Sequence, residues 1–198
     1  MEPGLLLAFA GFAFVSSITP GPNNTMLLAS GGNYGFWRTV PHIAGIGLGC
    51  VAMVLLVGLG LGQILAAVPL LHAVLRDAGA AYLLWLAWKI GRAGPVTDDK
   101  SSGRPMTFWQ AAAFQWVNPK AWVVVVGAVG TYAPRDGFGR AVAMLAVLLG
   151  TVMVPSISVW AAFGTALRPV LRHPGHVRIL NVTLALLLVL SLLPLLGH

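Results

Sequence analysis

Six apolar stretches dominate this sequence, and each is long enough to cross a bilayer as an α-helix, which takes about 20 residues. Charged residues form 9% of the chain, far below the share typical of soluble domains. Lipid covers apolar side chains that water would otherwise contact. We therefore predict an all-α membrane protein, a six-helix bundle. The predicted segments are residues 5–30, 41–67, 73–91, 107–132, 139–163 and 178–197.

The charge and cysteine content exclude several other classes. The net charge of +7 does not indicate nucleic-acid binding, because the twelve Lys and Arg residues are dispersed among short connecting segments. Cys50 is the only cysteine, so the chain can form no internal disulfide. No cluster of Cys and His residues suggests a metal ligand set. We expect neither a metal nor a cofactor. His42 and His72 lie near segment ends, where we expect the membrane interface.

The distribution of Lys and Arg predicts the orientation of the chain. Eight of these residues lie in the first, third and fifth connectors, namely Arg38, Lys89, Arg92, Lys100, Arg104, Arg168, Arg172 and Arg178. Arg76, Arg135 and Arg140 lie in the second and fourth connectors. Cytoplasmic loops are enriched in Lys and Arg. We therefore predict that the odd connectors are cytoplasmic and that both termini are periplasmic.

The six segments form one transmembrane domain, residues 1–198, with two similar halves. Repeat one spans about 5–91, a polar loop about 92–106, and repeat two about 107–197. With three helices per half, the second half enters the membrane with opposite polarity, so the repeats are inverted. Segments one and four are both interrupted, at Thr19–Asn24 and at Asn118–Lys120. Paired interruptions of this kind point to the binding site of a transporter.

The first interruption, TPGPNN, contains Thr19, Pro20, Gly21, Pro22, Asn23 and Asn24. Each proline lacks an N–H group and clashes with the preceding turn, which frees carbonyl groups from the helix. In lipid these groups need partners from the protein or from water in a cavity. The segment is therefore a candidate binding site for a polar solute, and the alternative is a kink that only improves packing.

Lys120 follows Asn118 and Pro119 and is the only charged residue well inside segment four. A lysine at the bilayer centre costs about 2.5–3.5 kcal/mol on insertion scales, so it needs a partner or a function. Its ammonium group could bind a substrate carboxylate, assisted by the positive N-terminal end of the following half-helix. Alternatively, the segment begins near Trp116 and Lys120 reaches the interface.

The other candidates carry weaker signals. Asp77 could bind a substrate amine or a coupling proton, or it could stabilise a helix N-terminus at the interface. Four further side chains could line a cavity: Tyr82, Gln115, Trp116 and Ser156. The patterns Gly45-x-x-x-Gly49 and Gly58-x-x-x-Gly62 permit close helix packing within the bundle or in a homodimer.

Four of these features together resemble the LysE/RhtB family of bacterial amino-acid exporters. They are Ile18-Thr-Pro-Gly-Pro-Asn23, Gly45-Ile-Gly-Leu-Gly49, Gly79-Ala-Ala-Tyr-Leu-Leu-Trp85 followed by Trp88-Lys89, and Asn118-Pro119-Lys120. The resemblance covers nearly the whole chain. It implies an inner-membrane exporter of amino acids or similar small metabolites, driven by the proton-motive force. Many members carry an acidic residue just after the glycine run, where this chain has Cys50.

Three alternatives to a secondary exporter remain at this point. A channel would pass its solute without saturation, and a metal-ion exporter of the same superfamily would need a ligand cluster. A membrane-embedded enzyme would need a catalytic set, and the five acidic residues of the chain suggest none. We therefore expect no enzymatic activity, an amino-acid substrate and the lipid bilayer as partners, and we leave a homodimer open.

Overall fold

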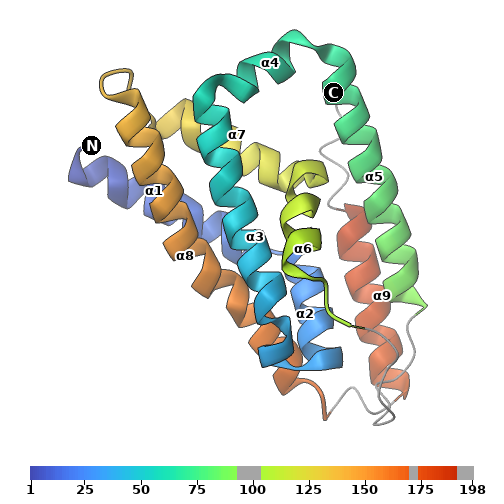
Figure 1. The fold of residues 1–198 in the computed structure, drawn as a ribbon. Coiled ribbons are helices and arrows are strands. Elements are labelled where there is room, and N and C mark those ends of the chain that lie inside the picture. Colours follow the sequence, from blue (N-terminus) through green and yellow to red (C-terminus); the bar gives the residue numbers. More distant parts are fainter. Residues whose placement is uncertain (93–103, 170–173, 191–198) are drawn as a thin grey trace.

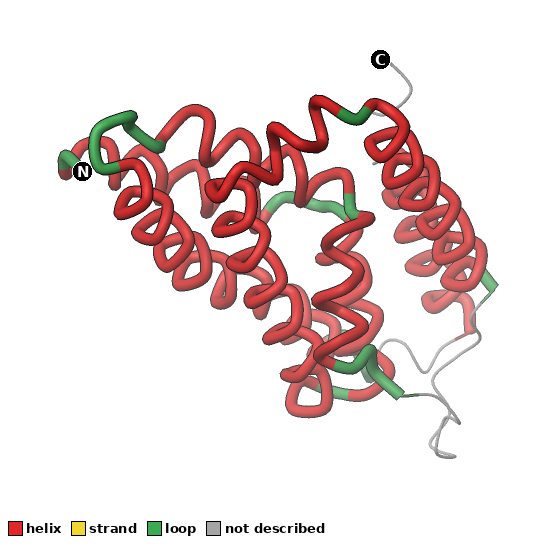
Figure 2. Tube along the Cα trace, turned by 45° about the horizontal axis from the view of Figure 1, so that its top comes forward, coloured by secondary structure: helices red, strands yellow, loops and turns green. Residues whose placement is uncertain are grey.

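In a computed structural model, the described residues are 1–92, 104–169 and 174–190, and these contain helices but no strands (Figures 1 and 2). The predicted all-α class is therefore confirmed. Most of the polar loop at 92–106 and the end of the sixth predicted segment, from residue 191, lie outside the described residues. The division into two repeats stays a prediction.

The first predicted segment is a bent pair of helices. Helix α1 (Pro3–Ile18) and helix α2 (Pro22–Tyr34) meet at an angle of 55°. Between them, Thr19 and Gly21 have extended backbone conformations. Pro22 occupies the first turn of α2, where its missing N–H costs nothing. The TPGPNN sequence thus breaks the helix, as predicted.

A long helix, a short crossing helix and a second long helix follow. Helix α3 (Phe36–Leu56) continues into a π-helical turn (Val57–Leu61), then come α4 (Gly62–Ala67) and α5 (Pro69–Gly91). Gly60 has φ 105° within the π-helical turn, a conformation that favours glycine. In Figure 1, α4 crosses the top of the molecule between α3 and α5.

The second half begins with another broken segment. Helix α6 (Phe108–Phe114) ends in a 3₁₀ turn (Gln115–Val117), and α7 (Pro119–Tyr132) starts afresh. Asn118 between them is extended, and its side chain accepts a hydrogen bond from the Lys120 amide. Helix α8 (Phe138–Ala166) and helix α9 (Pro174–Leu190) complete the described chain.

Helix α8 lies at the centre of the packing, against α1, α2 and α3, while α5 pairs with α9 (Figure 1). Glycines allow the closest approaches. A Cβ added at Gly45 would meet the Phe108 carbonyl oxygen at 2.3 Å, and one at Gly49 would meet the Ala112 Cα at 3.0 Å. The glycine pattern of α3 therefore serves packing against α6 within the bundle.

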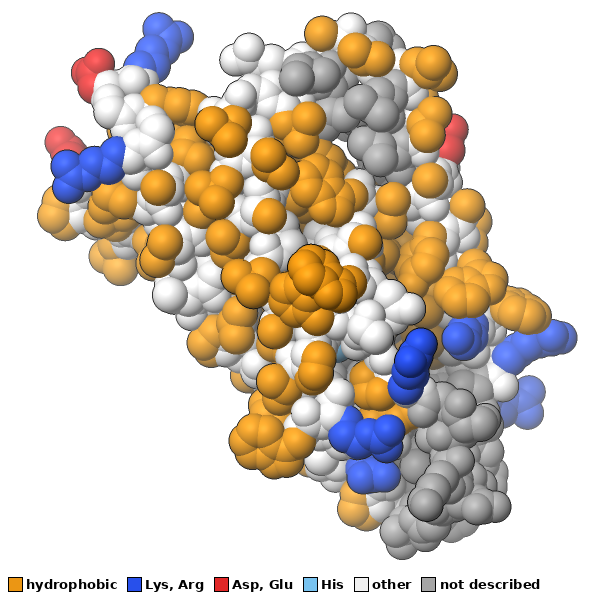
Figure 3. Space-filling view, viewed as in Figure 1, with side chains coloured by type: hydrophobic (Ala, Val, Ile, Leu, Met, Phe, Trp, Pro, Cys, Tyr) orange, Lys and Arg blue, Asp and Glu red, His pale blue; other side chains and the backbone are white. Residues whose placement is uncertain are grey.

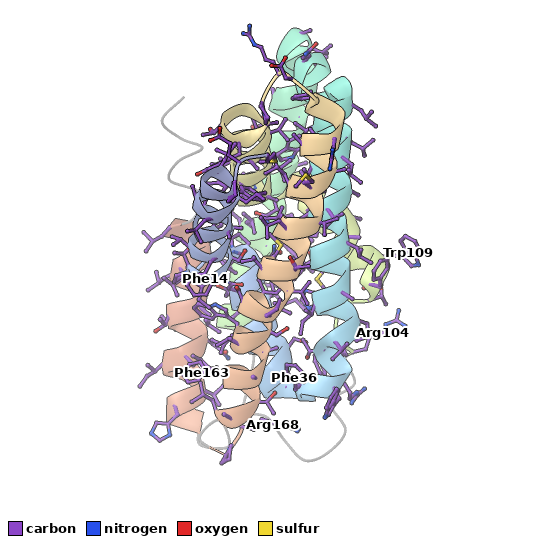
Figure 4. All side chains as sticks on the ribbon, turned by 90° about the vertical axis from the view of Figure 1, so that its left-hand side faces the viewer. Phe14, Phe36, Arg104, Trp109, Phe163 and Arg168 are labelled. Carbon is purple, nitrogen blue, oxygen red and sulfur yellow. The ribbon has the colours of Figure 1, made fainter. Side chains whose placement is uncertain are left out.

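The face seen in Figure 3 is largely apolar, and its Lys and Arg side chains gather toward two opposite ends. Trp109 is 77% exposed, and Phe14 and Phe163 are each about half exposed. The Trp109 side chain stands clear of the helices in Figure 4. Such a surface would be unfavourable in water but suits the hydrocarbon region of a bilayer.

The predicted count of six spans is not confirmed. By length and hydropathy, two helices in the described residues can span a membrane, Phe36–Leu61 and Phe138–Ala166, and the bent α1–α2 pair can form a third span. Helix α5 carries Arg76, Asp77 and Lys89, which lower its hydropathy. Helix α9 has 17 described residues, and α6 and α7 are short because of their break.

The structure also corrects two predicted connectors. Arg38 was expected between segments but lies in the first turn of α3. The stretch from Pro69 to Asp77 was expected to connect segments two and three, but it forms the first turns of α5. In both places a proline or glycine starts the helix earlier than the apolar pattern does, because polar residues are tolerated at helix ends near the interface.

Candidate functional site

The two helix breaks meet at a small cavity in the bundle. Its volume is about 30 Å³, enough for a water molecule and too small for an amino acid. It is lined from both breaks and by α1, α3 and α8, with no acidic residue among its described lining. The lining residues are Ser16, Ser17, Gly21, Asn23, Asn24, Cys50, Asn118, Lys120, Ala121, Val124, Met153 and Ile157.

Gln115 is fully buried and joins the two breaks through its side-chain amide. Its Nε2 donates to Asn23 Oδ1 at 3.1 Å, and Asn23 Nδ2 donates back to Gln115 Oε1 at 2.9 Å. Asn118 Nδ2 donates to the same oxygen at 3.3 Å. Asn23 and Gln115 are 92 positions apart in the sequence, so their paired amides hold one broken segment against the other.

Lys120 joins the breaks a second time. Its ammonium group donates to the Thr19 carbonyl at 2.9 Å, the Thr19 hydroxyl at 2.9 Å and the Pro20 carbonyl at 3.2 Å. An ammonium group has three N–H donors, and each therefore has an oxygen partner. Lys120 also places its charge at the C-terminal end of α1, which is the negative end of the helix dipole.

Other side chains satisfy the remaining carbonyl groups at the first break. Asn24 Nδ2 donates to the carbonyls of Ser17 and Thr19, both at 2.7 Å. The indole N–H of Trp160, on α8, donates to the Ile18 carbonyl at 3.1 Å. The carbonyls of residues 17 to 20 thus all accept hydrogen bonds from side chains. The carbonyl groups freed by the prolines therefore have the protein partners that a membrane environment requires.

Two buried polar atoms of the cavity lining have no hydrogen-bond partner within the described residues. They are the hydroxyl oxygen of Ser17 and Oδ1 of Asn24. The residues are 4% and 3% exposed, so bulk water does not solvate them. Unpaired buried polar groups are costly, and here they lie where a polar solute would bind. The N-terminal turns of α2 and α7 also adjoin the cavity, bringing two positive helix ends to it.

Cys50 lies on α3 at the position where the resemblance leads us to expect an acid. Its side chain is buried and lines the cavity. The Sγ atom lies 3.7 Å from Gln115 Oε1. The structure thus places this position at the junction of the two breaks, although the chain has a weakly polar thiol there rather than a carboxylate.

The structure brings five of the nine predicted binding residues to the cavity: Gly21, Asn23, Asn24, Asn118 and Lys120. Thr19 and Pro20 contribute oxygens that hold Lys120. Pro22 and Pro119 begin the two half-helices. Gln115, a weaker candidate, bonds to the lining residues directly.

The remaining weak candidates do not line the cavity. Asp77 is exposed on α5. Tyr82 packs its ring against Phe114, with centroids 5.1 Å apart. Trp116 accepts a hydrogen bond from Trp122 through its carbonyl. Ser156 donates to the Val152 carbonyl one turn earlier in α8.

The sequence interpretation missed Ser16, Ser17 and Trp160. The serines precede TPGPNN directly, so their proximity to the break was the available signal. Trp160 lies 142 residues from Ile18, and nothing in the local sequence indicates that contact. His42, expected at the interface, is instead 1% exposed in α3, and neither ring nitrogen has a partner in the described part of the chain.

Comparison with known proteins gives a consistent assignment. Residues 14–195 match the family model described as LysE type translocator. The chain is 37% identical over 191 residues to the cysteine/O-acetylserine efflux protein of Escherichia coli K12 and 36% identical to that of Salmonella typhi, with 96% of each chain covered in both cases. No solved structure matches. The relatives are efflux proteins rather than enzymes, as predicted for this chain. The chain belongs to the LysE type translocator family of membrane transport proteins.

Proposed function

We propose that this protein is an inner-membrane secondary exporter of small neutral amino acids such as cysteine and O-acetylserine, driven by the proton-motive force. The observation that carries the proposal is the meeting of two broken helices at a cavity lined by amides and one lysine. The efflux relatives, similar over 96% of the chain, support the same substrate class.

In the proposed mechanism, the substrate binds between the two breaks. Its carboxylate would bind Lys120, and the positive N-terminal ends of α2 and α7 would stabilise the same charge. Ser17 and Asn24, whose buried oxygens lack partners, would bind other polar groups of the substrate. Because the cavity holds only about 30 Å³, the breaks must move apart to admit an amino acid. Rocking of two inverted repeats would provide that movement.

The direct test is transport by purified protein in proteoliposomes. Radiolabelled L-cysteine and O-acetylserine should show saturable uptake that is stimulated by unlabelled substrate on the opposite side. An imposed pH gradient should accelerate net flux. Flux proportional to concentration would indicate a channel, and the absence of amino-acid flux would reject the proposal. Insensitivity to the pH gradient would reject proton coupling alone.

A matched pair of lysine variants tests the site. Lys120→Ala should reduce flux at subsaturating substrate at least about tenfold, the loss expected for one charge-assisted hydrogen bond. Lys89→Ala is the control, because Lys89 lies over the Trp85 ring on α5 at 5.0 Å and does not line the cavity. Equal flux in the two variants would remove Lys120 from the site.

A further inference from the structure

The oxygens that hold Lys120 form a site with the chemistry of an ammonium receptor. Three oxygens lie within 3.2 Å of Nζ, namely the Thr19 carbonyl, the Thr19 hydroxyl and the Pro20 carbonyl. We call these three oxygens the oxygen cage. None of them carries a full charge, so the cage neutralises no cation and binds an ammonium group through hydrogen bonds alone.

A zwitterionic amino acid needs a cation for its carboxylate and acceptors for its ammonium group, and this cage can supply the acceptors. The substrate brings one carboxylate and one ammonium group, and the described lining of the cavity offers one cation, Lys120, and no anion. Lys120 can bind the carboxylate only if its N–H donors leave the cage. The cage oxygens would then lose their donor at the same time as the substrate ammonium group needs acceptors.

We propose that the oxygen cage of Thr19 and Pro20 is the binding site for the substrate's α-ammonium group, which replaces Lys120 there while Lys120 turns to the substrate carboxylate. The exchange leaves the net charge of the site unchanged, because one ammonium group replaces another and the zwitterion is neutral. It rests on the proposed function, and it restricts the substrates to molecules that carry both a free amine and a carboxylate.

The surroundings of the cage fit this exchange. A Cβ added at Gly21 would lie 2.9 Å from Lys120 Cδ and 3.2 Å from Nζ. The absence of a side chain at Gly21 therefore leaves room for the lysine stem beside the break. Gly21 has φ 175°, which any residue can adopt, so space rather than backbone conformation is the reason for glycine. Thr19 and Pro20 are exposed and lie beside the cavity rather than in its lining, and Lys120 and Gly21 belong to both places. The unpartnered Asn24 Oδ1 in the adjacent lining is a further acceptor.

The exchange also explains how binding could widen the small cavity. With Lys120 in the cage, its hydrogen bonds tie the second break to the first over a sequence separation of about 100 residues. A substrate that binds the cage oxygens through its ammonium group and Lys120 through its carboxylate lies between the two breaks. The direct contact between the breaks at this point is then replaced by a contact through the substrate, whose affinity favours the separated arrangement.

Substrate analogues test the cage in counterflow of L-cysteine under reducing conditions. The analogue 3-mercaptopropionate lacks the amine, and cysteamine lacks the carboxylate. In wild-type protein each should compete at least about tenfold more weakly than L-cysteine, because each leaves one charged partner unsatisfied. Competition by 3-mercaptopropionate equal to that of L-cysteine would overturn the cage proposal while leaving amino-acid export intact.

Two variants of Thr19 assign the effect to the cage. Thr19→Val removes the hydroxyl with little change in shape and should raise the half-saturation constant for L-cysteine about tenfold. The inhibition constant of 3-mercaptopropionate should not change, since that compound has no amine. Thr19→Ser keeps the hydroxyl and should restore most of the affinity that Thr19→Val loses. Thr151→Val is the control outside the site, because Thr151 is exposed on α8 and does not line the cavity, and it should leave both constants unchanged.

The outcomes of the two proposals differ. An equal rise of both constants in Thr19→Val, or no change in either, would overturn the cage, whereas a wild-type protein that carries no amino acid would overturn the proposed function as well. Competition by the analogues and the two constants of Thr19→Val thus test the cage, and the presence of amino-acid transport by the wild-type protein tests the proposed function.

Discussion

Gln115 contributes more to the site than any other single side chain that carries no charge. Its Oε1 accepts hydrogen bonds from Asn23, Asn118 and Cys50, and its Nε2 donates to Asn23 and to the Ala111 carbonyl. Buried amide networks specify one arrangement when all members are satisfied, and they are costly when one member is lost. Gln115 therefore positions both breaks.

Gln115→Leu should destabilise the protein by about 1–3 kcal/mol, because it leaves buried Asn118 and half-buried Asn23 without this partner. The thermal unfolding midpoint in detergent measures the effect. Gln110→Ala is the matched control, since Gln110 lies in α6, directly before the 3₁₀ turn of Gln115, and is exposed in a capping box with Thr107. The control should cost at most about 1 kcal/mol. Equal losses would show that the buried amide network of Gln115 adds no more stability than the exposed Gln110 does.

Helices α2 and α8 cross at a point where each helix has a glycine. A Cβ at Gly31 would lie 2.1 Å from the Ala161 carbonyl oxygen, and a Cβ at Gly164 would lie 2.1 Å from the Leu28 carbonyl oxygen. Thr165 donates to the Gly31 carbonyl at 3.2 Å across the same crossing. Small residues at crossings let helices approach closely in membranes, and this crossing holds the second half of the first broken segment in place.

Gly164→Ala should therefore destabilise the bundle by about 1–3 kcal/mol, the usual cost of overpacking. Gly130→Ala in α7 is the control, because no atom lies within 4 Å of its added Cβ. That substitution should be neutral or stabilising by up to about 1 kcal/mol, since alanine favours helix more than glycine does. Unfolding midpoints of both variants measure the difference, and a neutral Gly164→Ala would contradict the close crossing.

At the level of elements, the sequence predicted the breaks well and the partners of the breaks poorly. Pro20, Pro22 and Pro119 predict broken helices because proline cannot continue the hydrogen-bond ladder. Which side chains satisfy the freed carbonyls depends on tertiary packing, so Trp160 and the cage around Lys120 could not be predicted. Cys50 lies within a predicted apolar segment, and its place at the cavity follows from the approach of α3 to α6, which the sequence does not indicate.

In the described part of the chain, arginines lie near both ends of the long helix α8. This helix has 29 residues, so its ends lie about 43 Å apart at 1.5 Å per residue. Arg140 is near its start, and Arg168 follows its end, where a Cβ added at Gly35 would lie 3.6 Å from the Arg168 guanidinium group. Arg104, Phe36 and Arg168 all lie in the lower half of the molecule in Figure 4. Arg38 follows Phe36 in the first turn of α3.

This arrangement extends the sequence-based prediction of orientation. The end with Arg38, Arg104 and Arg168 should face the cytoplasm, because Lys and Arg are retained on that side. The opposite end, with Glu2, Arg135, Asp136 and Arg140, carries both acidic and basic residues and should then face the periplasm. Apolar hydropathy alone could not assign the orientation, since it is the same for both directions through the membrane.

Labelling of introduced cysteines in whole cells tests the orientation. Gly139→Cys is exposed near the start of α8 with no atom within 4 Å of its Cβ, and Trp37→Cys replaces a side chain that is 83% exposed beside Arg38. A membrane-impermeant maleimide should label Gly139→Cys in intact cells and Trp37→Cys only after permeabilisation. Wild-type protein is the blank, because Cys50 is 1% exposed. The opposite pattern would reverse the orientation, and the direction of export through the two breaks would have to be assigned anew.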